Sequence, residues 1–85
     1  MEIVVARFYF HLHAGDELLI DDEGQDWPDL SAARREAELA ARELLAEAIR
    51  AGKERVPEGF VIADEAGRAL DIVLLAAVLP KLFKK

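Results

Sequence analysis

The sequence predicts an α+β fold of two layers, in which one long helix covers one face of a four-stranded antiparallel sheet. Two short apolar stretches with strand character precede the helix and two follow it, in the order β-β-α-β-β. With 85 residues, of which 53% are hydrophobic, the chain is expected to form a single domain. Its core is expected over residues 7–75, followed by a basic and apolar tail over residues 76–85.

The helix is predicted over residues 30–51, where small apolar residues recur at helical spacing. Asp29 is expected to cap the N-terminus, and Gly52 is expected to take the left-handed conformation beyond the C-terminus. The opposite side is charged, apart from Leu39 in its middle. The buried stripe is predicted to contain Leu30, Ala33, Ala37, Ala41, Leu44 and Ala48.

The first hairpin is predicted from residues 3–13 and 17–21, because apolar and polar residues alternate along the first of these stretches. A three-residue turn over residues 14–16 would place Leu12 opposite Leu18 and Phe10 opposite Ile20. Phe10 is therefore expected to be among the most buried residues, beneath the helix. The acidic residues 21–26 are expected to form a loop that leads into the helix.

The second hairpin is predicted from residues 59–63 and from a strand that ends near residue 75. A three-residue loop with Gly67 in a left-handed conformation would pair Ile62 with Leu70 and Phe60 with Ile72. If the four expected strands are numbered in sequence order, a fully antiparallel sheet allows the spatial orders 2-1-3-4 and 1-2-4-3. We prefer 2-1-3-4, because it centres the aromatic first strand and keeps a right-handed crossover.

Several segments, taken in order along the chain, form a recognisable pattern of turns, caps and core positions. These segments are Arg7–Leu12, Gly15–Asp16, Asp21–Gly24, Pro28–Leu30 and Asp64–Arg68. The pattern resembles a family of small bacterial domains of unknown function with an aromatic first strand, an Asp-Glu-Gly loop, an Ala-rich helix and a second hairpin. The resemblance covers residues 7–74 and implies the fold. It implies no activity.

Composition excludes several classes of function. A net charge of −6 argues against nucleic acid as a partner, because phosphate binding needs a basic surface. No apolar run approaches the roughly 20 residues of a membrane span, and no membrane partner is expected. The start of the sequence has an acid, Glu2, where a secretion signal has basic residues, so a cytoplasmic location is expected.

Metal chemistry is the main catalytic alternative. His11 and His13 lie two apart on a strand and share a face, and Asp71 belongs to that face by parity. Two imidazoles and a carboxylate could hold zinc in a metal-dependent enzyme, whereas the competing explanation is a solvated or dimer-facing surface.

The acidic loop has its glycine at the fourth position, not at the sixth as in an EF-hand. No cysteine is present and Ser31 is the only serine, so we expect neither enzyme activity nor a cofactor.

The favoured expectation is a small interaction domain that forms homo-oligomers, since the sheet face away from the helix is more apolar than a solvated surface needs. An alternative is a regulatory module, similar to small antitoxin domains, that holds another protein through a sheet edge or the open sheet face. The residues predicted for the interface are Tyr9, His11, Leu19, Val61 and Val73, with Leu39 as a smaller second contact.

Overall fold

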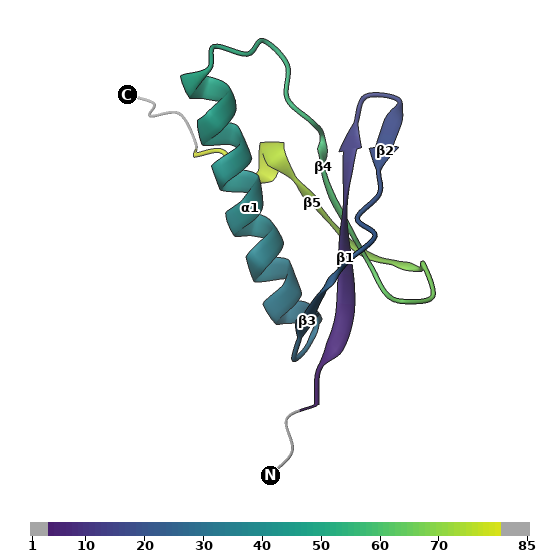
Figure 1. Ribbon diagram of the computed structural model, residues 1–85. Helices are drawn as coiled ribbons and strands as arrows, with labels where there is room; N and C mark the ends of the chain where they lie inside the picture. Colours follow the sequence, from purple (N-terminus) through teal and green to yellow (C-terminus); the bar gives the residue numbers. More distant parts are fainter. Residues whose placement is uncertain (1–3, 81–85) are drawn as a thin grey trace.

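The computed structural model describes residues 4–80 and places one long helix against one face of an antiparallel sheet (Figure 1). Residues 1–3 and 81–85, with part of the predicted tail, lie outside the described residues. The sheet order is β2-β1-β4-β5, with β3 also paired to β1, so the predicted fold class and the preferred order of the four expected strands are confirmed. The elements are β1 (Ala6–Ala14), β2 (Glu17–Leu19), β3 (Gln25–Trp27), α1 (Leu30–Arg50), β4 (Gly59–Ala63), β5 (Ala69–Leu74) and a 3₁₀ helix, η1 (Leu75–Val78).

α1 begins and ends where its capping residues predict. The side chain of Asp29 accepts a hydrogen bond from the backbone N–H of Ala32 at 2.8 Å. Beyond the last turn Gly52 has a φ of 69°, and the N–H of Lys53 donates to the carbonyl of Ala48 at 2.9 Å, as in a Schellman motif. No helix within residues 4–80 is long and apolar enough to cross a membrane.

Small side chains let α1 lie close to the sheet. Ala33, Ala37 and Ala41 have no exposed surface, which confirms the centre of the predicted stripe. A bulkier side chain there would push the helix away from a closely packed interior. The other buried residues of this core are Phe8, Phe60, Ile62, Val73 and Leu75.

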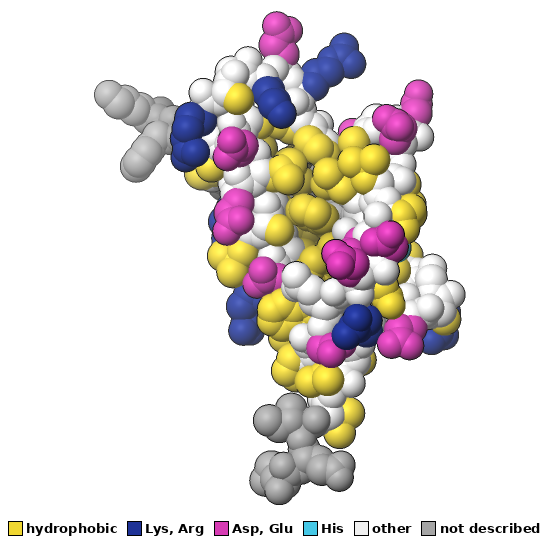
Figure 2. Space-filling view, viewed as in Figure 1, with side chains coloured by type: hydrophobic (Ala, Val, Ile, Leu, Met, Phe, Trp, Pro, Cys, Tyr) yellow, Lys and Arg dark blue, Asp and Glu magenta, His cyan; other side chains and the backbone are white. Residues whose placement is uncertain are grey.

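α1 does not lie over the middle of the sheet. It packs mainly on β4, β5 and η1, and it touches β1 less. Phe10 and Leu12 are therefore only half-buried, and Ile20 is 64% exposed. The prediction that Phe10 is among the most buried residues is wrong, and Phe8 takes that place. Figure 2 shows the hydrophobic side chains that gather in the hollow between α1 and the sheet.

The first hairpin turns through two residues, Gly15 and Asp16, instead of the three predicted. As a result Leu12 pairs with Leu19 and not with Leu18. A slip of one residue moves every side chain of a strand to the opposite face. Leu18 therefore lies on the side of the sheet away from α1, and Leu19 lies on the side of α1.

The second hairpin is also shifted by one residue, because an irregularity interrupts the β4–β5 ladder near the turn. Ile62 pairs with Asp71 instead of Leu70. The faces of β5 are consequently the reverse of those predicted. Val73 is 2% exposed beneath α1, whereas Ile72 is 55% exposed on the other face.

β3 is an additional strand within the predicted acidic loop. It pairs with the beginning of β1, where Gln25 lies opposite Phe8. From Phe8 to Leu12 the chain of β1 advances four residues, while the opposing chain advances six, from Leu19 to Gln25. β2 and β3 are therefore two parts of one edge strand, and a bulged acidic loop separates them.

Candidate functional site

The open face of the sheet is the side that α1 does not cover (Figure 1). Residues directly opposite one another in an antiparallel ladder point to the same side, so the observed register defines this face. Three of its apolar side chains, Leu18, Ile72 and Leu74, are 44%, 55% and 49% exposed. The open face consists of Tyr9, His11, His13, Leu18, Val61, Ile72 and Leu74.

The open face differs in part from the predicted interface. Tyr9, His11 and Val61 lie on it as expected, whereas Leu19 and Val73 lie on the side of α1. Leu39 is 46% exposed on the outer surface of the helix. Because the register of each hairpin differs by one residue from the prediction, Leu18, Ile72 and Leu74 lie on the open face in place of Leu19 and Val73. The sequence prediction missed these three residues.

Asp21 fixes the acidic loop against β1. One carboxylate oxygen accepts from the N–H of Phe10 at 3.1 Å, and the other accepts from the N–H groups of Glu23 and Gly24 at 3.1 and 3.2 Å. The N–H of Asp21 itself donates to Nδ1 of His11 at 3.0 Å. Burial raises the pKa of Asp21, but the three backbone donors outweigh it, so the pKa lies below its usual value.

Gly24 completes this loop next to the open face. Its φ is 73°, and a Cβ atom there would lie 2.8 Å from both Arg7 Cγ and Tyr9 Cε2. Arg7 also donates from Nη1 to the carbonyl of Glu23 at 3.0 Å. The segment from Asp21 to Gly24 is thus shaped by contacts with β1, which explain an aspartate at position 21 and a glycine at position 24, whereas Glu23 takes part only through its backbone N–H and carbonyl.

The two histidines are not arranged as the alternative metal site with Asp71 would require. Because Nδ1 of His11 accepts a hydrogen bond, its neutral ring carries the proton on Nε2 and has no lone pair left for a metal. Nδ1 of His13 lies 2.8 Å from a carboxylate oxygen of Glu58. The expectation that Asp71 shares their face is wrong, since it pairs with Arg34 of α1 on the opposite side. Within residues 4–80 no group of three His, Asp or Glu side chains is placed to hold a metal ion.

The rings of Tyr9 and His11 stack on one another at the centre of the open face. Their centroids are 6.4 Å apart and their planes differ by 22°. Offset stacking of this kind restricts both side chains. Together with the bond between His11 and Asp21, it gives the middle of the open face a fixed shape.

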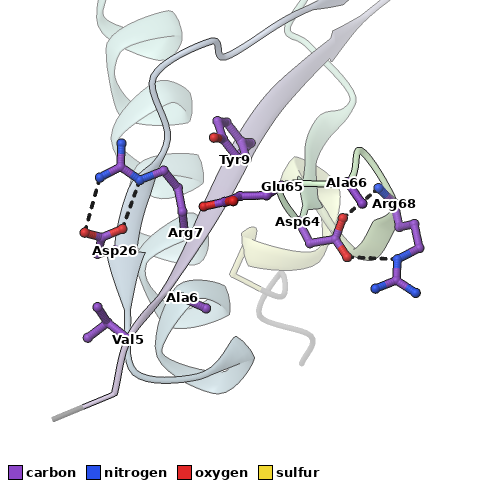
Figure 3. A pocket seen from close by; sticks show the side chains of 9 residues that line it. All are labelled: Val5, Ala6, Arg7, Tyr9, Asp26, Asp64, Glu65, Ala66 and Arg68. Atoms are coloured by element: carbon purple, nitrogen blue, oxygen red, sulfur yellow. Dashed lines mark hydrogen bonds and ion pairs between the residues drawn. The ribbon is translucent and has the colours of Figure 1, made fainter. Parts of the chain in front are cut away.

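A shallow hollow of about 910 Å³ lies at one end of the open face (Figure 3). Arg7 donates from Nε and Nη2 to the two carboxylate oxygens of Asp26 at 3.0 and 3.2 Å. Arg68 donates from Nε to Asp64 at 3.0 Å. Both guanidinium groups that line the hollow therefore have carboxylate partners within the domain.

The fold and the open face together define a small two-layer α+β domain whose polar motifs stabilise its own loops. The chain belongs to the family described as Domain of unknown function (DUF6894), whose model matches residues 7–76. The expected membership in a family of domains of unknown function is thereby confirmed. No curated protein and no solved structure matches the chain.

Proposed function

We propose that this chain is a small protein-interaction domain that forms a homodimer through the open face of its sheet. The observation that supports this proposal most is that Ile72 and Leu74 on β5, and Leu18 on the opposite edge strand β2, lie on the same face, each about half exposed. Monomeric proteins rarely expose contiguous apolar patches above a few hundred Å². Covering such a patch is favourable by about 25 cal/mol per Å².

A second copy is the partner that fits this surface best. In a two-fold dimer the same patch contacts itself, so an apolar patch needs no other sequence to complement it. The stacked Tyr9 and His11 would lie at the centre, where aromatic residues are enriched in interfaces. The ion pairs of Arg7 and Arg68 lie toward the end of the face, as polar groups of an interface rim do.

Sedimentation at tens of micromolar tests the proposal. The wild type is expected to be a dimer, and Ile72→Glu is expected to be a monomer because it places a charge inside the contact. Leu39→Glu is the matched control, since Leu39 has similar exposure on the outer side of the helix. A monomeric wild type, or a dimeric Ile72→Glu, would contradict the proposal.

The alternative function, a regulatory module that holds another protein, has a second apolar surface available to it besides the sheet edge and the open face. A groove between α1 and the sheet is lined by Leu12, Leu44, Val56 and Phe60. Leu44→Glu would impair binding at this groove and leave an open-face dimer intact. If Leu44→Glu is a monomer and Ile72→Glu remains a dimer, the dimer contact lies at the groove beside α1 and not on the open face.

A further inference from the structure

β5 is the last strand at one edge of the sheet. The N–H of Leu75 donates to the carbonyl of Glu58 at 2.9 Å, which continues the ladder between β5 and β4. Backbone groups alternate in direction along an antiparallel strand. The N–H and carbonyl groups of Ile72 and Leu74 therefore point outward, away from β4. Such a row is a template on which another strand can pair.

Side chains of the same molecule occupy the middle of this edge. The N–H of Ile72 donates to Oδ1 of Asp71 at 2.8 Å. Nη1 of Arg34 donates to the other carboxylate oxygen of Asp71 and makes a long contact of 3.5 Å with the carbonyl of Ile72. Glu38 lies 3.7 Å from Nε of Arg34 and helps to orient it. Both outward backbone groups of Ile72 thus have an intramolecular partner.

The opposite edge of the sheet is protected differently. There β2 and β3 have three residues each, and the bulged acidic loop separates them. Short and interrupted strands are poor templates for pairing. β5 has six residues, and Leu70, Ile72 and Leu74 on it are 39%, 55% and 49% exposed. Of the two edges, β5 is the one that needs a specific block.

We propose that Arg34 and Asp71 block the β5 edge against pairing with β5 of a second copy. Antiparallel pairing about a two-fold axis at Ile72 would bring Leu70 opposite Leu74 of the other chain, which is a self-complementary apolar arrangement. The block concerns the edge of the sheet and not its open face. An experiment can therefore support or contradict the proposed block whether or not the open face forms the proposed dimer.

The expected consequence of removing the block is association, with little change in melting temperature. Arg34 and Asp71 are 41% and 32% exposed, and ion pairs at such exposure contribute little to stability. A pair that only stabilised the fold would show the reverse behaviour, with a lower melting temperature and unchanged mass. The two roles are thus separable in one set of variants.

The experiment compares Asp71→Ala and Arg34→Met with the wild type by sedimentation over a range of concentrations. Arg34→Met keeps the aliphatic stem on the sheet and removes the guanidinium. Arg50→Met is the matched control, because it removes one positive charge from another exposed ion pair, between Arg50 and Glu47 on α1, away from the sheet edge. We expect the mass of both edge variants to rise about twofold or more above the wild type, as pairing of copies requires, and that of Arg50→Met to stay unchanged.

Backbone amide exchange identifies the contact. Pairing of β5 edges should slow exchange at the outward N–H of Leu74 in Asp71→Ala as concentration rises, whereas packing of sheet faces adds no hydrogen bond there. Unchanged mass, or a larger species without slower exchange at Leu74, would overturn the proposal. If Asp71→Ala does not fold by circular dichroism, Arg34→Met decides the question by the same two measurements.

Discussion

The carboxylate of Asp21 takes the place of a neighbouring strand for Phe10. It accepts the backbone N–H of Phe10 at 3.1 Å in the gap between the end of β2 and the beginning of β3. Without this contact β1 would have an unpaired donor in its middle, which is costly when it is shielded from water. The acidic residue therefore maintains the continuity of the sheet edge across the bulged loop.

Asp21→Ala is expected to destabilise the protein. It leaves the N–H groups of Phe10, Glu23 and Gly24 without their acceptor, at a cost of about 2–3 kcal/mol for partly exposed donors. Asp22→Ala is the matched control, because Asp22 is an exposed neighbour whose loss should change stability by less than about 0.5 kcal/mol. Urea unfolding measures both, and equal midpoints would show that Asp21 does not hold the loop.

Stability is expected to decrease in acid. The pKa of Asp21 is lowered in the folded state, so its contribution is fully present above the unfolded-state pKa of about 3.9 and is lost as the pH falls through the lower folded value. The pKa of Asp71 is lowered as well, first by the hydrogen bond from Arg34. Urea midpoints measured from neutral pH downward should fall below about pH 4, and the fall should be smaller in Asp21→Asn. An equal pH dependence in Asp21→Asn would count against this assignment.

The sequence was sufficient to predict the elements of the central layer. β1 alternates strictly between apolar and polar side chains, so the position of Tyr9 and His11 on the face away from Phe8 follows from its pattern. The caps at Asp29 and Gly52 are local signals, and they fix both ends of α1 without reference to the rest of the chain.

The registers of the two outer strands could not be predicted in the same way. Leu18, Leu19 and Ile20 are consecutive apolar residues, as are Ile72, Val73 and Leu74, so a slip of one residue exchanges one apolar side chain for another. A pattern fixes register only where the two faces differ. Two of the six residues predicted for the interface, Leu19 and Val73, were misplaced for this reason.

β3 was missed for a different reason. Gln25 and Asp26 have low strand propensity, and neither alternation nor a turn signal identifies them. Their pairing with β1 depends on cross-strand contacts with residues distant in the sequence, such as the two hydrogen bonds between Asp26 and Arg7, which lies directly opposite it. Tertiary contacts of this kind are not visible in a single local segment.

Phe8→Ala is expected to destabilise the protein more than Phe10→Ala. Phe8 is 6% exposed within the core, and its truncation should cost about 3–5 kcal/mol through lost burial and a residual cavity. Phe10 is half-buried at the rim of the hollow beside α1, so its truncation removes less buried surface. Thermal melts of the two variants compare these costs directly. A larger loss for Phe10→Ala would mean that α1 covers the centre of β1 after all.

A pair of glycine variants separates backbone strain from steric contact. Gly67 has a φ of 84°, as predicted for its turn, and a Cβ atom there would have nothing within 4 Å. Gly67→Ala should therefore cost only the left-handed penalty of about 1–2 kcal/mol. Gly24 has a φ of 73°, but its Cβ would also lie 2.8 Å from Arg7 and Tyr9 and 3.0 Å from the carbonyl of Phe8.

Gly24→Ala should consequently lower the free energy of unfolding by at least about 1 kcal/mol more than Gly67→Ala, because the side chains on β1 must move as well as the backbone. Urea unfolding of the two variants gives this difference. Far-UV circular dichroism should show that both remain folded before the comparison is made. If the two substitutions lower the free energy of unfolding equally, the acidic loop can shift around residue 24 without cost. The close approach to Arg7 and Tyr9 would then not constrain the open face.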